Sequence, residues 1–116
     1  MLLYDVAQWK VSKANSKKHL EMIRKIAEAI KRNRGKLYLT HSTFCVLKSE
    51  DPSVETWMGI DEYKDEESYD KFTKEFRKNN PDWAEFFKIK DEWMSFFVPK
   101  SLNHEVFIEK PELRIA

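Results

Sequence analysis

His41 and Asp61 are the residues of this sequence whose types and positions best suit proton transfer. His41 stands within an extended segment, among the hydroxyl residues Thr40, Ser42 and Thr43. An imidazole exchanges its proton near neutral pH, so in a lined cleft His41 could act as a general base. The alternative is a strand histidine whose ring is hydrogen-bonded by a neighbouring hydroxyl group. We take His41 and Asp61 as candidate catalytic residues, beside which a closed pocket is expected.

A second carboxylate, Asp5, also falls within a segment of strand character. Carboxylates are unfavourable in strands unless they are paired or face a polar cavity. If Asp5 and Asp61 both project into one cleft, they could share a proton or orient a polar substrate. The alternative is a salt bridge from each carboxylate to one of the many lysines of this chain.

Large aromatic side chains could form the walls of a small-molecule site. Trp9, Trp57 and Tyr63 lie in predicted strands and could line a flat, mostly apolar ligand pocket together with Asp5. Packing at a dimer interface, where Trp and Tyr are enriched, is the competing interpretation, and the two are compatible. A second aromatic group is assigned to the core instead: Trp83, Phe86, Phe87 and Trp93.

Other reactive residues carry less chemistry. Cys45 is the single cysteine, and its place between two apolar residues predicts an inert core thiol, because a nucleophilic thiol needs a nearby cation or helix start. His19, His41 and His104 lie on different predicted elements without metal-binding spacing, so no metal site is expected. We expect no cofactor, although the sequence does not exclude haem binding, because haem needs only one axial histidine.

Charge and composition restrict the classes of partner. Lys and Arg number 21 against 20 Asp and Glu, which gives a net charge of +1 and lacks the basic surface of a nucleic-acid binder. The sequence contains no apolar run of about 18 residues and no apolar signal core, so we expect a cytoplasmic protein without membrane contact. A charged fraction of 35% with one glutamine leans towards a thermophilic source.

The elements that position these residues follow from hydrophobic periodicity. Strands are predicted at residues 2–12, 36–50, 54–64 and 93–98, and helices at 16–35, at 65–79 and after Pro81. Leu20, Ile23, Ala27 and Ile30 recur at helical spacing in the first helix, and Gly35 suits its end. Asp65 is expected to cap the second helix.

This β-α-β-β-α-β order predicts an α+β protein of the ferredoxin-like kind, with a four-stranded antiparallel sheet and its helices on one face. Residues 1–116 form one domain, in which residues 100–116 are a C-terminal extension that packs on its own or a partner subunit. Apolar residues occupy both faces of the third strand, since Trp57 and Tyr63 alternate with Met58 and Ile60. A second copy of the sheet would cover the uncovered face, so we expect a homodimer.

At three places the chain resembles the dimeric α/β-barrel superfamily, and within it the NIPSNAP-like proteins. These are YDVA at residues 4–7, YKD at residues 63–65, and NPDWAEF at residues 80–86. The chain departs from the family at Asp61-Glu62, where an aromatic–Arg pair is common, and at Ala7, where an Arg is common. The resemblance implies a homodimer with a ligand cleft, in a superfamily that ranges from cofactor-free oxygenases to haem-associated proteins.

The leading functional hypothesis is therefore a homodimeric small-molecule-binding protein, for example a cofactor-independent oxygenase-like enzyme. The alternative is a non-enzymatic interaction or ligand-sensing module built on the same scaffold. RNA binding is a third hypothesis, because the RNA-recognition module shares the element order. The third strand lacks that module's aromatic motif, and its Asp61-Glu62 would repel phosphates.

Overall fold

The computed structural model describes residues 1–33, 40–77 and 81–115. Within them the strands are β1 (Leu3–Ser12), β2 (Thr40–Cys45), β3 (Val54–Tyr63) and β4 (Asn103–Ile108). The helices are α1 (Ser16–Asn33), α2 (Glu66–Arg77) and α3 (Ala84–Met94), with short 3₁₀ turns at Lys13–Asn15, Pro81–Trp83 and Pro111–Leu113. The predicted helix end at Gly35 and the predicted strand residues 36–39 lie outside the described residues.

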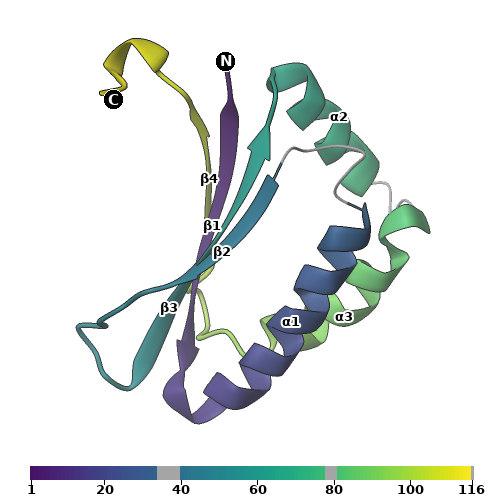
Figure 1. The fold of residues 1–116 in the computed structure, drawn as a ribbon. Helices are drawn as coiled ribbons and strands as arrows, with labels where there is room; N and C mark the ends of the chain where they lie inside the picture. The colour runs from purple at the N-terminus through teal and green to yellow at the C-terminus, as the bar shows by residue number, and fades with distance from the viewer. Residues whose placement is uncertain (34–39, 78–80, 116) are drawn as a thin grey trace.

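The four strands form one sheet in the order β2-β3-β1-β4, and every neighbouring pair is antiparallel. This order and the helices on one face confirm the predicted ferredoxin-like fold (Figure 1). The two central strands, β1 and β3, pair along their whole length, with Asp5 directly opposite Asp61 and Trp9 opposite Trp57.

The predicted fourth strand at residues 93–98 is wrong. Trp93 and Met94 end α3, and Phe97 makes only an isolated bridge to Val11. The fourth strand is instead Asn103–Ile108, from the segment assigned to the C-terminal extension, and it pairs with β1 of the same chain. Of the aromatic residues that suggested a strand, Trp93 belongs to the helix, whereas Phe96 and Phe97 follow it in a turn and an isolated bridge. Aromatic side chains suit a buried face of any of these elements.

The second strand is also shorter than predicted. It ends at Cys45, and residues 46–53 make the connection to β3. Cys45 is exposed, so the interpretation of a buried core thiol is wrong. Leu47, which was predicted to lie within this strand, is almost fully exposed in the connection.

Helix α1 forms because its apolar residues return every three or four positions and meet the sheet. The buried positions include His19, Met22, Ile23, Ile26 and Ile30, which lie one above another on one helix face. Leu20, assigned to this stripe from spacing, is instead partly exposed beside it. The buried face is rotated by about one position, and His19 takes the buried place, where it contacts Trp9 and Trp57.

Helix α2 begins where the sequence predicted. The Ser68 backbone N–H donates to Asp65 Oδ1 at 2.8 Å, which satisfies one of the unpaired N–H groups of the first turn. This hydrogen bond lowers the pKa of Asp65, because it stabilises the carboxylate form. Glu66 and Glu67 follow in the first turn, where the helix dipole favours negative charge.

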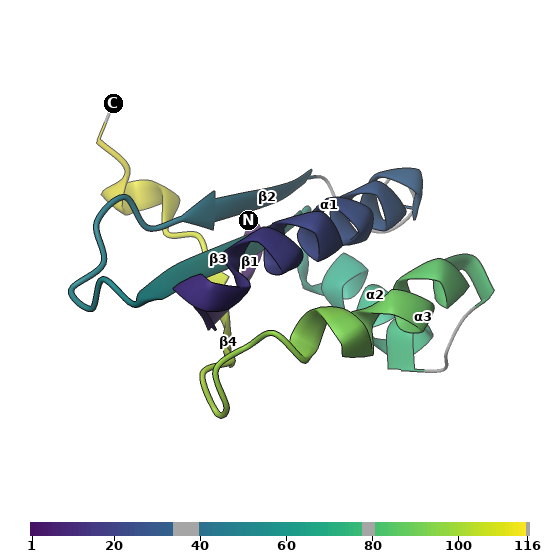
Figure 2. The same cartoon turned by 90° about the horizontal axis from the view of Figure 1, so that it is seen from below.

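All three helices lie on one side of the sheet, and α1 and α3 run beside each other across it (Figures 1 and 2). One buried cluster joins Tyr63 of β3 to Ile26 of α1 and to Trp83. A second cluster joins Trp9 and Val11 of β1 to Ile23. None of the three α-helices of the described residues covers the other side of the sheet (Figure 2). By strand register, partly exposed apolar side chains such as Phe44 and Phe107 lie on that side.

In the described part of the chain, no helix combines the length and apolar character needed to cross a membrane.

Candidate functional site

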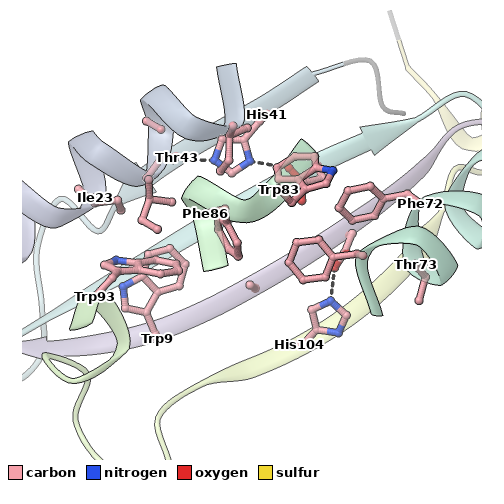
Figure 3. Close-up of a pocket in the computed structure, with 18 of the residues that line it drawn as sticks. Trp9, Ile23, His41, Thr43, Phe72, Thr73, Trp83, Phe86, Trp93 and His104 are labelled. Atoms are coloured by element: carbon pink, nitrogen blue, oxygen red, sulfur yellow. Dashed lines mark hydrogen bonds and ion pairs between the residues drawn. The ribbon is translucent and has the colours of Figure 1, made fainter. Parts of the chain in front are cut away.

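A cavity of about 330 Å³ lies between the sheet and the helices (Figure 3). Aromatic rings form most of its wall: Trp9, Tyr69, Phe72, Phe76, Trp83, Phe86 and Trp93. Aliphatic side chains of α1, such as Ile23, close another side. The floor is the sheet itself, where Ala7 and Gly59 leave the backbone of the central strands uncovered. The cavity is therefore mostly apolar and flat-sided, as small-molecule sites usually are.

The polar residues of the cavity lie in a row across the sheet. Asp61 of β3 is directly opposite His41 of β2 on one side and Asp5 of β1 on the other. His104 of β4 lines the cavity beside Asp5. The two histidines thus come from the edge strands and the two carboxylates from the central strands. Sheet pairing brings His41, Asp61 and Asp5 side by side, and His104, which pairs with Ala7, reaches Asp5 diagonally through its side chain.

The contact between His41 and Asp61 defines the protonation of the imidazole. His41 Nδ1 lies 2.5 Å from Asp61 Oδ1, and both side chains are largely buried, at 19% and 25% exposure. An ionised carboxylate only accepts hydrogen bonds, so Nδ1 carries the proton that is donated. Nε2 then holds a lone pair, and the Thr43 hydroxyl, 3.2 Å away, can donate to it. A histidine held in this way is oriented to act as a base at Nε2.

A second histidine–carboxylate pair joins His104 Nε2 to Asp5 Oδ1. The Asp5 side chain is 14% exposed, whereas that of His104 is 53% exposed. Burial raises the pKa of Asp5, the His104 imidazole opposes this rise, and the negative charge of Asp61 adds to it. Asp5 therefore holds a proton more readily than an ordinary surface aspartate.

A buried histidine, which is not among the described residues that line the cavity, holds one end of the cavity in place. His19 Nε2 accepts hydrogen bonds from the indole N–H groups of Trp9, at 3.0 Å, and Trp93, at 3.3 Å. Two donors on one nitrogen require a neutral ring with its proton on Nδ1. Burial lowers the pKa of His19, although the charge of Glu55 opposes this, so the neutral form is favoured. His19 thereby fixes two tryptophans of the cavity wall.

The structure brings four of the six predicted site residues together at the cavity: His41, Asp61, Asp5 and Trp9. Trp57 and Tyr63 are not among the described residues that line it. Trp57 packs on His19, with ring centroids 4.9 Å apart, and Tyr63 is fully buried against Tyr69. Both face the helices, as Trp9 does, but they lie beyond the two ends of the cavity, where the core is filled.

Several cavity residues were missed or assigned to other roles. Trp83, Phe86 and Trp93, which were assigned to the core, line the cavity, and Trp83 is buried as well. His104 was assigned to the C-terminal extension because the fourth strand was placed ten residues too early. His104, Val106 and Ile108 occupy every second position, as residues on one face of a strand do. This spacing is the signal that could have placed His104 on the inner face of a strand.

Metal ligands do not converge in the described residues, where no group of three His, Cys, Asp or Glu side chains could hold an ion. Each cavity histidine is paired with a carboxylate rather than with a second histidine.

The similarity of this chain to known proteins is found by comparing structures and not by comparing its sequence with family models or curated proteins. No protein-family model and no curated protein matches it. The solved structure of an antibiotic biosynthesis monooxygenase is 15% identical, with 94% of this chain and 99% of that chain covered and a TM-score of 0.64. SnoaB from Streptomyces nogalater, a cofactor-independent oxygenase, is 10% identical over 94% and 93%, with a TM-score of 0.60.

A dimeric ferredoxin-like protein from an uncultured marine organism is 15% identical over 94% of this chain and 90% of its own, with a TM-score of 0.62. At these identities the likeness establishes the fold. The chain has the ferredoxin-like fold that antibiotic biosynthesis monooxygenases and dimeric ferredoxin-like proteins also have.

Proposed function

We propose that this protein is a cofactor-independent oxygenase that binds a flat aromatic compound with an acidic hydroxyl group. The observation that carries the proposal is the His41–Asp61 pair, which lies on the strands of a mostly apolar cavity walled by aromatic rings. The oxygenase part is supported by the structural likeness to SnoaB and to an antibiotic biosynthesis monooxygenase. That likeness covers most of the chain, although fold alone does not determine function.

The cavity selects for flat rings because its floor and walls are flat. Gly59 itself puts no side chain on the floor, so a ring that lies on the strands there would be bordered by the side chains of His41 and Trp9. The surrounding indole and phenyl groups offer faces and edges for stacking. Burial of an aromatic ligand in such a site gains about 25 cal/mol per Å² of apolar area removed from water. A hydroxyl group on the ring can then replace the Thr43 hydroxyl as the donor to His41 Nε2.

His41 starts the reaction by taking the hydroxyl proton at Nε2. The resulting imidazolium is stabilised by Asp61, whose carboxylate accepts the Nδ1 hydrogen bond. The ligand anion is electron-rich at ring carbons conjugated with the oxygen, and it can reduce dioxygen directly. For 1-naphthol, the products are 1,4-naphthoquinone and one water: C4 gains one oxygen atom and is oxidised, and the second oxygen atom leaves as water.

A homodimer is part of the proposal. Residues next to the cavity-facing positions point to the other side of the sheet, and they include Phe44, Met58, Ile60 and Phe107. A second sheet would bury these side chains, and one structural neighbour is a dimeric ferredoxin-like protein. Light scattering should give twice the chain mass of 14.0 kDa, and Phe107→Lys should shift the protein to the monomer. A monomer at all concentrations would exclude this part.

The proposal also includes a relationship to NIPSNAP-like proteins and a cytoplasmic location. The closer resemblance to NIPSNAP-like proteins rests on motifs such as residues 80–86, of which residue 80 lies outside the described residues. A cytoplasmic location accords with the single cysteine.

The binding test compares 1-naphthol with its methyl ether, 1-methoxynaphthalene, which has no hydroxyl proton. Quenching of tryptophan fluorescence reports occupancy, because Trp9, Trp83 and Trp93 line the cavity. The wild type should bind 1-naphthol at least about tenfold more tightly than the ether, since one hydrogen bond to an imidazole is at stake. His41→Gln should remove most of this preference, whereas Ser42→Ala, on the opposite face of the same strand, should retain it.

The activity test follows oxygen uptake and quinone formation with 1-naphthol in metal-free buffer containing a chelator. His41→Gln and Asp61→Asn should each lower kcat by about 100-fold or more, the usual contribution of an oriented base. Naphthol that binds with the expected preference and is never oxidised would refute the oxygenase and favour the ligand-sensing module. Equal binding of naphthol and its ether would refute the assigned role of His41.

A further inference from the structure

His104 and Asp5 form a polar pair in the cavity that the proton abstraction by His41 leaves unused. Such a pair is costly in a mostly apolar site, because a buried carboxylate loses its hydration. An apolar pair would fill the same strand positions, as it does where Leu3 of β1 faces Ile108 of β4. The position of the second pair inside the cavity therefore points to chemistry.

The two pairs adjoin through their carboxylates. Asp5 and Asp61 are direct cross-strand partners, a position in which side chains lie about 5 Å apart at their Cβ atoms. Two like charges at this distance repel, which favours one shared proton or a hydrogen-bond donor beside each carboxylate. His41 supplies such a group on one side and His104 on the other. The arrangement is a continuous row from the buried ring of His41 to the half-exposed ring of His104.

Oxygenation of a phenol needs a proton donor as well as a base. After dioxygen adds to C4 of the naphtholate, the peroxide anion takes up one proton, which His41 can return from its imidazolium form. His41, neutral again, then takes the C4–H proton, the O–O bond breaks, and the departing hydroxide takes up a second proton from another donor to become water. Two protons are removed from the substrate and two are returned to oxygen, so the reaction balances without an external reductant.

We propose that His104, held by Asp5, is the second catalytic residue of this site and the proton donor to the oxygen that leaves as water. This assignment rests on the proposed oxygenase function. His104 suits the role because its ring lines the cavity and is also half exposed, so it can be reprotonated from solvent between turnovers. His41 is more buried and serves the substrate hydroxyl.

The ionisable side chains that line the cavity with His104 come from three strands and one helix. They are Asp5 from β1, Asp61 from β3, His41 from β2 and Tyr69 from α2. Their contributions are separated by variants that keep the side-chain size, namely His104→Gln, Asp5→Asn and Asp61→Asn. Glu105→Gln is the matched control, because it is the next residue of β4 and points away from the cavity.

The kinetic test measures 1-naphthol oxidation by the dimer or monomer as purified. His104→Gln should lower kcat by about 100-fold and change naphthol affinity by less than about twofold, since it acts after binding. Free imidazole should restore part of the activity, because the site of His104 is open to solvent. Glu105→Gln should match the wild type. Wild-type kcat in His104→Gln, or loss that imidazole never restores, overturns the proposal.

A ligand-free measurement separates this inference from the proposed function. The Asp5 carboxyl carbon is titrated by 13C NMR in the wild type and in the variants. The pKa of Asp5 should rise in His104→Gln, which removes the opposing cation, and fall in Asp61→Asn, which removes the neighbouring negative charge. If the wild type never oxidises naphthol, the proposed oxygenase function is refuted, but these pKa shifts would still support electrostatic coupling of Asp5 to His104 and Asp61. If the pKa of Asp5 is the same in the wild type and in both variants, the coupling of Asp5 to His104 and Asp61 is refuted, whatever the activity of the protein.

Discussion

Gly59→Ala should stabilise the protein and weaken its ligand binding at the same time. Gly59 lies in the middle of β3 on the cavity floor, and a Cβ there would meet His41 Cε1, Trp9 Cη2 and Trp9 Cζ3, each at 3.6 Å. These are ordinary van der Waals distances, so the methyl group fits without displacing a neighbour. Glycine within a strand costs about 0.5–1 kcal/mol relative to alanine, because it loses more backbone freedom on folding.

The three new carbon contacts add about 0.1–0.2 kcal/mol each. Together with the backbone term, the free energy of unfolding should increase by about 1 kcal/mol, which raises Tm by about 4 °C for a domain of this size. The methyl group takes roughly 30 Å³, the space of one water molecule, from the floor between His41 and Trp9. A ring lying there must then lift away from His41, and a misplaced methyl-sized group in an apolar pocket costs roughly tenfold in affinity.

Thermal unfolding and naphthol titration of the same samples check both effects. Ile60→Val is the control, because it trims a methyl group on the opposite face of the same strand. It should lose a little stability and leave naphthol affinity unchanged. If Gly59→Ala lowers Tm, the space above Gly59 is not as described. If Tm rises while naphthol affinity stays the same, the ligand does not lie on this part of the sheet.

Two further predictions concern the elements that support the cavity. The pKa of His19 is lowered in the folded chain, so below about pH 6.5 the unfolded chain binds a proton at this residue more readily than the folded chain does. The free energy of unfolding should therefore fall with decreasing pH, by at most about 1.4 kcal/mol per pH unit from this group. Urea unfolding at several pH values should show this slope in the wild type but not in His19→Gln, and an equal slope in both would contradict the neutral, doubly bonded ring. Asp65→Ala should lower Tm by a few degrees through loss of the α2 cap, whereas Asp65→Asn, which keeps an acceptor, should lower it less. Because the pKa of Asp65 is lowered, the difference in Tm between wild type and Asp65→Ala should persist above about pH 4 and shrink to about that of Asp65→Asn as the pH falls through the lowered value, since a protonated carboxyl still accepts a hydrogen bond.

The fourth strand shows why a local pattern leaves some elements undecided. Trp93, Phe96 and Phe97 suit a buried face of a helix, a turn or a strand equally, and local sequence does not distinguish these cases. The difference comes from β1, whose second edge pairs with Asn103–Ile108. That pairing brings His104 into the cavity, and no spacing rule within the sequence links residue 104 to residue 5.

The limits of the predicted pocket have a similar origin. Trp9 and Trp57 are cross-strand partners that face the same side of the sheet, so their sequence patterns are alike. Only Trp9 reaches the cavity, because His19 of α1 packs against Trp57 and fills the space beyond it. Where a helix fills the inner face and where it leaves a void depends on side chains from several elements at once.

The sequence by itself determined the α+β element order, the Asp65 cap and the strand positions of His41 and Asp61, because periodicity, capping and turn residues act over a few neighbours. The tertiary structure decided that His41 bonds Asp61, that Asp5 and His104 continue the row, and that Gly59 opens a floor beneath aromatic rings. These depend on the register between strands and on how the helices pack over them, and such contacts join residues up to a hundred positions apart.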